Sequence, residues 1–156
     1  MTDKKKLAGF YQSRNILGED YNPMEMTRFT EVPTFMRAPQ VKELSELDIG
    51  IIGIPYDGGL TCRAGARHGP REVRNESSMM RAINVVTDVR PFEVARIADI
   101  GDVQFGNMFS QAEVVADIER YYDAIAVANV TPLGIGGDHS VTYPILKALA
   151  KKHRQP

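Results

Sequence analysis

The stretch of the chain that decides the fold is VTPLGIGGDHS, residues 130–140. Its first six residues form an apolar run that predicts a short buried strand. The glycines that follow let the backbone turn tightly and come close to a ligand. Asp138 and His139 then stand where the carboxyl end of a strand meets the next helix. Because ligands of open α/β sheets bind at that edge, these two side chains mark a candidate functional site.

Two further apolar runs lie upstream. Residues 49–54, IGIIGI, form a continuous apolar run, as expected for a parallel strand that is covered on both faces. Residues 94–100 are a second strand candidate, which Gly101 ends. Together with residues 130–135, these runs predict three strands of one parallel sheet.

Helix signals alternate with the strands. Pro70 follows Gly69 at a first helical position, where its missing N–H costs nothing. Ser110 and Glu113 form a capping box, and Thr142 is a plausible cap for the last helix. The alternation indicates an α/β fold with right-handed crossovers. The sides expected to face inward are Val73, Met80 and Ile83; then Val114, Ile118, Tyr121 or Tyr122, and Ile125; and last Ile145, Leu146, Leu149 and Ala150.

The chain divides into two parts near Asp48. Residues 1–47 contain scattered prolines and aromatic residues and show no periodicity. They predict an irregular N-terminal segment that packs on the domain or on a neighbouring subunit. Residues 48–156 carry the strand and helix signals and form the α/β part.

The overall composition excludes several classes of function. A length of 156 residues suggests about one domain, and the net charge of −1 provides no field to attract nucleic acid or a membrane. The first residues lack the apolar stretch of a signal peptide, and no run approaches 18 apolar residues, so we expect no membrane span. The single cysteine, Cys62, forms no disulfide within the chain and fits a loop position, so we expect a cytoplasmic protein.

The glycines at 134–137 do not fit the known phosphate-binding motifs. A dinucleotide fingerprint needs glycine at the sixth position, where His139 stands, and the Gly-Lys-Ser/Thr of a P-loop is absent. From the residues alone, a plain glycine turn and a structural histidine remain open beside a metal site. Imidazole and carboxylate together suit Mn, Zn or Fe.

A second conspicuous stretch is the loop between residues 53 and 74. It contains four arginines within 12 residues, at positions 63, 67, 71 and 74. They indicate either an anion site or structural ion pairs, for which Asp57 and Glu72 are available. The residues favour the structural ion pairs.

Three motifs together resemble the ureohydrolases, the arginase and agmatinase family, and most closely the agmatinases. They are the GIPYD, Arg-X-Gly and Gly-Pro pattern within residues 53–74, Asp99 to Val103, and GGDHS at 136–140. The resemblance implies a three-layer α/β fold with helices on both faces of a parallel sheet, as in arginases and deacetylases. It also implies two Mn(II) ions, with His139 as a ligand of one, and hydrolysis of a guanidino compound to urea and an amine.

The resemblance covers only the first half of such an enzyme. The remaining metal ligands of the family lie in an Asp-X-His-X-Asp and a later Asp-X-Asp motif, and neither occurs here. We therefore expect a truncated fold with an open strand edge, inactive by itself, and a homo-oligomer when complete. The catalytic residues remain unassigned.

The substrate is predicted to be a linear guanidino compound. Agmatine is the first choice, and a guanidino acid, as in guanidinobutyrase or guanidinopropionase, is the alternative. Tyr143, four residues past His139, could stack on the substrate chain or donate to a carboxylate, or pack under the helix. A non-catalytic scaffold derived from this fold is the alternative of another class. A zinc amide hydrolase related to the deacetylases lacks support, because those enzymes do not resemble residues 53–74.

Overall fold

The centre of the molecule is a parallel sheet. The computed structural model describes residues 4–153, and in this part of the chain the sheet comprises β3 (Ile49–Ile54), β4 (Ile97–Asp102) and β5 (Thr131–Gly136) in the order β4-β3-β5. Ile51, in the central strand, pairs with Asp99 on one side and Leu133 on the other. The parallel sheet is confirmed, with β4 beginning three residues later than predicted and β5 one residue later.

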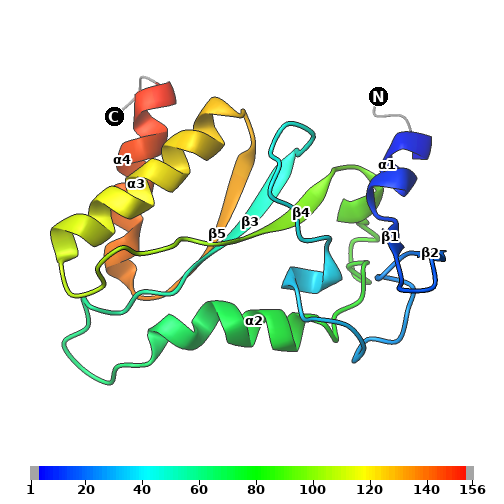
Figure 1. Cartoon of the computed structure of the whole chain (residues 1–156), viewed down its shortest axis with the longest axis horizontal. Coiled ribbons are helices and arrows are strands. Elements are labelled where there is room, and N and C mark those ends of the chain that lie inside the picture. Colours follow the sequence, from blue (N-terminus) through cyan, green and yellow to red (C-terminus); the bar gives the residue numbers. More distant parts are fainter. Residues whose placement is uncertain (1–3, 154–156) are drawn as a thin grey trace.

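Helices cover both faces of the sheet (Figure 1). Helix α2 (Gly69–Ser77) lies on one face, and α3 (Gln111–Val127) and α4 (Thr142–His153) lie together on the other. The connection from β3 to β4 runs one way across the sheet, and that from β4 to β5 returns past β3. Right-handed crossovers therefore place α2 and α3 on opposite faces. The three-layer α/β fold is confirmed.

The main core lies between the sheet and the pair α3 and α4. Val114, Ile118, Tyr122 and Ile125 of α3 are buried there, as the helical spacing predicted. The serine half of the capping box also forms, because the Ser110 hydroxyl accepts from the Glu113 amide.

The inward faces predicted for α2 and α4 are partly wrong. Val73 and Met80 are exposed, because α2 ends at Ser77 and turns Pro70 and Arg74 toward the sheet. Leu146 of α4 is also exposed, since Pro144 and Ala148 form the buried row instead.

The N-terminal segment is more regular than predicted. It forms α1 (Lys4–Phe10), a hairpin of β1 (Ser13–Arg14) and β2 (Asp20–Tyr21), and a short 3-10 turn at Phe35–Arg37. The Tyr11 hydroxyl donates to the Ala95 carbonyl at 2.5 Å and accepts from the Ile97 amide at 2.8 Å. The segment is thereby attached to the start of β4.

The two edges of the sheet differ. Residues 39–41 run beside β4, where the Asp99 amide donates to the Pro39 carbonyl and the Val41 amide donates to the Asp99 carbonyl, both at 3.0 Å. Beside β5, no strand pairs on the outer side within residues 4–153, and Leu133 is 46% exposed. The sheet is therefore closed along β4 and open along β5. In the same described part, none of the helices has the length and apolar character needed to span a membrane.

Candidate metal and substrate site

The strands run in parallel, and the carboxyl ends of β3 and β5 are where the topology of an open α/β sheet puts its ligand crevice. The chain leaves β3 toward α2 on one face and leaves β5 toward α4 on the other, so the two loops diverge. Asp138 bridges these loops: its Oδ2 accepts from the Gly59 amide at 2.7 Å. Its Oδ1 accepts from the Ser140 amide at 2.8 Å and from the Ser140 hydroxyl. The buried carboxylate therefore holds the β5 loop against the β3 loop.

Glycine is required at position 137 by close backbone contact. A Cβ there would lie 2.1 Å from the Tyr56 carbonyl oxygen and 2.6 Å from that of Ile54. The same approach allows the Gly137 amide to donate to Ile54 at 3.2 Å and the Asp138 amide to donate to Tyr56 at 2.9 Å. The second glycine of GGDHS thus aligns the two strand ends.

His139 stands at the mouth of this crevice. It is exposed and begins the short 3-10 turn His139–Val141 that leads into α4. Its Nδ1 lies 3.3 Å from the Thr142 hydroxyl oxygen, and Nε2 has no hydrogen-bond partner among residues 7–152, whose side chains the structure describes. The ring is therefore held at one nitrogen and accessible at the other, which suits a metal ligand.

The described residues do not complete a metal centre. Within them, no three or more His, Cys, Asp and Glu side chains come together as a cluster that could hold an ion. Both oxygens of Asp138 are already occupied by amides and a hydroxyl. His139 is thus the candidate metal ligand of the GGDHS loop, while Asp138 serves to hold the two loops together.

Titration of the 156-residue chain with Mn(II) is expected to show no tight stoichiometric site. A transition-metal site usually takes about three or more protein ligands, and one imidazole holds the ion only weakly. Isothermal titration or the electron paramagnetic resonance signal of free Mn(II) measures this. A sub-micromolar site that disappears in His139→Ala would show that the centre is complete after all.

The loop after β3 is stabilised by an ion pair between the buried Asp57 carboxylate and the exposed Arg67 side chain. Asp57 accepts from Arg67 Nε at 2.6 Å, from the Gly65 amide at 2.7 Å and from the Arg67 amide at 3.3 Å. The hydrogen bond from the Arg67 side chain is the main reason that the pKa of Asp57 is lowered to about 2. Arg67 therefore forms a structural ion pair, as the residues favoured, and does not serve as an anion site.

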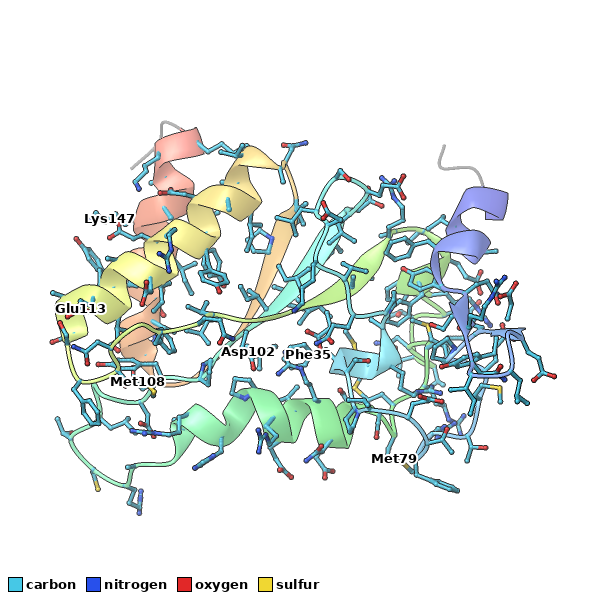
Figure 2. The ribbon with its side chains drawn as sticks, in the orientation of Figure 1. Phe35, Met79, Asp102, Met108, Glu113 and Lys147 are labelled. Carbon is cyan, nitrogen blue, oxygen red and sulfur yellow. The ribbon has the colours of Figure 1, made fainter. Side chains whose placement is uncertain are left out.

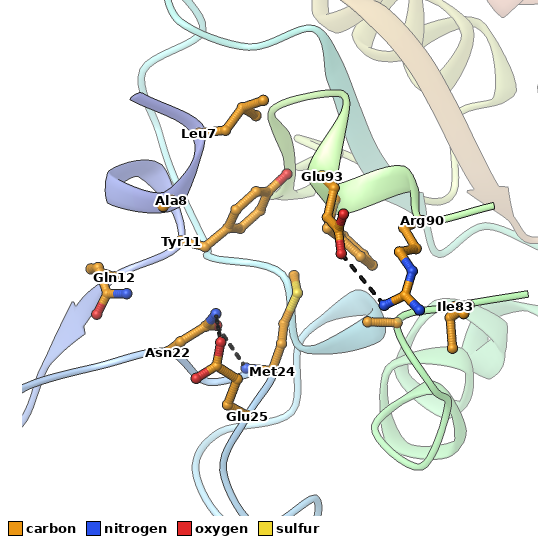
Figure 3. Close-up of a pocket in the computed structure, with 12 residues that line it drawn as sticks. Leu7, Ala8, Tyr11, Gln12, Asn22, Met24, Glu25, Ile83, Arg90 and Glu93 are labelled. Atoms are coloured by element: carbon orange, nitrogen blue, oxygen red, sulfur yellow. Dashed lines mark hydrogen bonds and ion pairs between the residues drawn. The ribbon is translucent and has the colours of Figure 1, made fainter. Parts of the chain in front are cut away.

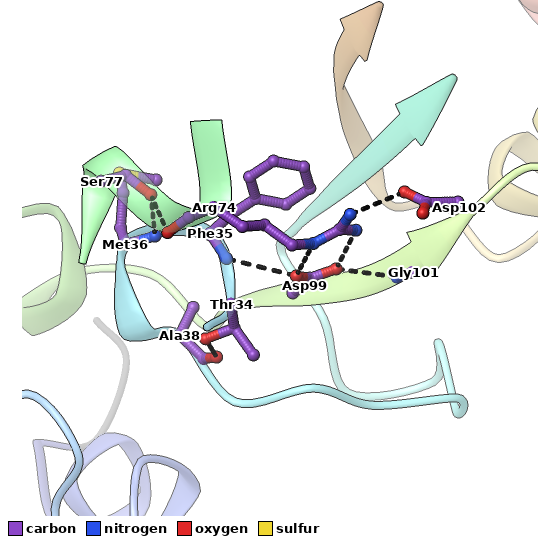
Figure 4. Close-up of polar contacts among 9 residues, drawn as sticks. All are labelled: Thr34, Phe35, Met36, Ala38, Arg74, Ser77, Asp99, Gly101 and Asp102. Atoms are coloured by element: carbon purple, nitrogen blue, oxygen red, sulfur yellow. Dashed lines mark hydrogen bonds and ion pairs between the residues drawn. The ribbon is translucent and has the colours of Figure 1, made fainter. Parts of the chain in front are cut away.

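Arg74 has a different partner from the one its sequence neighbours indicate (Figure 4). Its Nε donates to Asp99 at 2.7 Å and a terminal nitrogen donates to the same carboxylate at 3.0 Å. A second terminal nitrogen lies 2.8 Å from Asp102. The guanidinium also lies 4.0 Å from the centre of the Phe35 ring. Arg74 therefore pairs with the end of β4, and Glu72 is not its partner.

The remaining arginines of the loop are exposed. Arg63 and Arg71 form no ion pair with any side chain of residues 7–152, those that the structure describes. A cavity of about 430 Å³ at the carboxyl ends of β3 and β4 is lined by Arg71, His68, Asp102 and Met108, the last two of which are labelled in Figure 2. The Arg71 guanidinium could therefore bind an anionic group in this cavity.

Tyr143 lies outside that cavity. Its side chain is 64% exposed on α4, and the Lys147 ammonium is 5.9 Å from the centre of its ring. Its predicted contact with a substrate remains a prediction.

Comparison with known proteins gives a consistent picture. Residues 47–156 match the sequence model of the arginase family. The chain is 45% identical to guanidinopropionase of Pseudomonas aeruginosa, covering 82% of this chain and 40% of that protein. It is 47% identical to guanidinobutyrase of the same species, covering 83% and 41%. The chain thus spans well under half the length of the curated relatives it matches.

Solved structures agree with the sequence matches. A hypothetical agmatinase from Burkholderia thailandensis superposes with a TM-score of 0.78 at 31% identity, covering 83% of this chain and 41% of that one. A variant formiminoglutamase from Trypanosoma cruzi, described with Mn²⁺, gives a TM-score of 0.61 at 27% identity, covering 69% and 36%.

Proposed function

Because the chain belongs to the arginase family, we propose that it forms part of an amidinohydrolase that converts a small linear guanidino compound to urea and an amine. The observation that carries this proposal is the GGDHS loop, which presents the exposed ring of His139 at the crevice between the β3 and β5 loops. The relatives named guanidinopropionase and guanidinobutyrase support the type of reaction.

We propose two Mn(II) ions as the cofactor of the complete enzyme, with His139 as a ligand of one. The formiminoglutamase described with Mn²⁺ supports the choice of metal. Such ions, when bound, supply a nucleophile near neutral pH, which the resonance-stabilised guanidinium carbon requires. The other ligands would come from the part of the domain that the relatives have and this chain does not cover, so this chain alone would be inactive.

The residues of this chain would prepare the site rather than complete it. Asp138 fixes the loop that carries His139 against Gly59. Asp57 and Arg67 fix the shape of the β3 loop. Positioning of this kind lowers the entropic cost of bringing reacting groups together.

For the substrate, we favour a guanidino acid over agmatine. Guanidino acids are named in the relatives at 45% and 47% identity, whereas the chicken agmatinase is 40% identical. The exposed Arg71 could attract a carboxylate in the cavity that it lines, whereas a contact with Tyr143, which lies outside that cavity, would need a different pose of the substrate. Agmatine remains the second candidate, because agmatinases also match. A homo-oligomeric assembly and a cytoplasmic location remain further proposals.

A chimera tests the proposed function. This chain would replace the matching part of the Pseudomonas guanidinobutyrase, and urea release with Mn(II) would be assayed on guanidinobutyrate, guanidinopropionate, agmatine and arginine. We expect turnover of at least one guanidino acid, and loss of nearly all turnover in His139→Ala. A folded chimera that releases no urea from any of the four would favour the scaffold alternative. A preference for agmatine would contradict only the choice of substrate class.

A further inference from the structure

The arginines of the loop after β3 do not share one role. Arg67 and Arg74 are committed to the ion pairs described above. Arg71 is exposed on the first turn of α2 and forms no ion pair with a side chain of residues 7–152. Its neighbour on the helix, Glu72, is not part of the lining of the cavity. The described side chains therefore leave the positive charge of Arg71 without a neutralising partner.

The cavity that Arg71 lines also holds no free negative charge. Among the acidic side chains that the structure describes, Asp102 is the one on its lining, and its carboxylate lies 2.8 Å from Arg74. His68 adds an imidazole to the same wall. A cation that lacks a partner in a hollow attracts a small anion, and a guanidinium matches the two oxygens of a carboxylate.

A hollow near the amino end of β4 shows the opposite arrangement (Figure 3). It has a volume of about 490 Å³, and its lining includes one arginine, Arg90. The Arg90 guanidinium lies 3.5 Å from the Glu93 carboxylate and 3.6 Å from that of Asp88. Glu25 adds a further negative charge to the lining. This hollow therefore offers no unpaired cation to a ligand, unlike the cavity at Arg71.

The cavity at Arg71 lies beside the loop that carries His139. Gly69 begins α2 and packs against the end of β5, since a Cβ at this glycine would lie 2.8 Å from the Gly136 carbonyl oxygen. Gly136 stands three residues before His139 in the sequence. The helical turn that carries Arg71 therefore contacts the strand end that presents the candidate metal ligand.

An apolar wall connects the crevice with the free guanidinium. The cavity shares Phe105 and Met108 with a neighbouring hollow of about 600 Å³, whose lining extends to Gly58. The next residue, Gly59, donates its amide to Asp138 in the loop of the candidate site. The two hollows therefore form one trough that begins beside this loop and ends at the guanidinium. A largely apolar trough with a charged group at one end fits an alkyl chain that carries a carboxylate.

We propose that Arg71 selects substrates by the charge of their far end: it binds the carboxylate of a guanidino acid and repels the ammonium group of agmatine. This inference rests on the proposed amidinohydrolase function. With the guanidino group at the crevice, the methylene chain lies along Phe105 and Met108, and the carboxylate meets Arg71. Arginine and carboxylate form charge-assisted hydrogen bonds, whereas an ammonium group at the same place meets a like charge. Attraction of the acid and repulsion of the amine both contribute to the specificity.

Variants of the chimera with the Pseudomonas guanidinobutyrase test this role. Arg71→Gln should raise the KM for guanidinobutyrate about tenfold or more and change kcat far less, because it removes a binding contact away from the reacting carbon. Arg71→Glu should shift the ratio of kcat/KM for guanidinobutyrate and agmatine about a hundredfold toward agmatine, because it reverses the charge. Arg63→Glu is the matched control, since Arg63 is also exposed and lines neither hollow. It should change the ratio by less than about threefold, because a distant exposed charge is screened.

Binding measurements separate this inference from the proposed function. Calorimetry of the metal-free chimera with guanidinobutyrate and with agmatine needs no turnover, and Arg71→Glu should reverse which of the two binds more tightly. If the chimera releases no urea but this reversal occurs, the proposed function fails and the role of Arg71 stands. A wild-type chimera that prefers agmatine would overturn the role of Arg71. The same holds if Arg71→Glu and Arg63→Glu do not differ in binding or in turnover.

Discussion

Replacing Arg74 by alanine is expected to lower the free energy of unfolding by about 3–5 kcal/mol, the usual cost of leaving one partner of a buried ion pair alone. The Asp99 side chain is fully buried and receives two hydrogen bonds from Arg74, while the Arg74 side chain is only 12% exposed. Without the guanidinium, Asp99 keeps the Phe35 and Gly101 amides as donors but loses the neutralising charge. The contact of α2 with β4 would weaken as well.

Urea denaturation followed by circular dichroism would measure the loss. Arg71→Ala is the matched control, because Arg71 lies on the same helix, is exposed and forms no ion pair among residues 4–153; it should change stability by less than about 0.5 kcal/mol. Arg74→Lys keeps the charge but loses the two-pronged geometry, so an intermediate loss is expected and a soluble protein can be measured even if the alanine variant fails to fold. An alanine variant within about 1 kcal/mol of wild type would contradict the structural role of this pair.

The strand that precedes α2 could be predicted from the sequence, but the ion pair between Arg74 and Asp99 could not. The run IGIIGI predicted its strand to the residue, because a strand covered on both faces carries an uninterrupted apolar signal. The partner of Arg74 could not be obtained that way, since Asp99 is 25 residues away and meets it only after the β3-α2-β4 crossover forms. A signal was nonetheless present: Asp99 stands between apolar residues in the middle of the strand, and a buried carboxylate needs a cation.

In the candidate site, too, the local features could be predicted from the sequence and the contacts between distant residues could not. His139 and the glycine turn were predicted from local sequence, and the structure places them at the carboxyl ends of the strands. That Asp138 serves mainly to join two loops was not predictable, because its partner Gly59 lies 79 residues earlier. The error on the inward face of α2 has a related cause: helical spacing favoured Val73, but burial of Arg74 with its carboxylates decides how the helix is turned.

Because the edge of β5 is open, we expect the isolated chain to self-associate. Adding the part of the domain that the relatives possess should cover this edge and reduce the self-association. Unpaired N–H and C=O groups along an apolar edge strand are a template for another strand. Leu133 is 46% exposed on this strand, whereas β4 is covered by residues 39–41. Tyr122 adds a second sign of incompleteness: its hydroxyl is buried near Gly134 and has no hydrogen-bond partner among the described residues.

Leu133→Lys should reduce this association, because a lysine on an edge strand opposes pairing, whereas Lys at the exposed helical position Leu146 should not.

The stronger test is complementation. The remaining part of the Pseudomonas guanidinobutyrase, added as a separate chain, should form a soluble complex with this one, and only there should Tyr122→Phe cost about 0.5–1.5 kcal/mol as a lost hydrogen bond. Association by itself does not identify the edge, since a complete enzyme can also be an oligomer. If the chain stays monomeric, melts cooperatively and shows no change in solubility or stability when the other part is added, β5 does not need a further strand. If the complex forms but Tyr122→Phe costs nothing in it, the hydroxyl lies outside the new contact, and pairing along the strand alone accounts for the rescue.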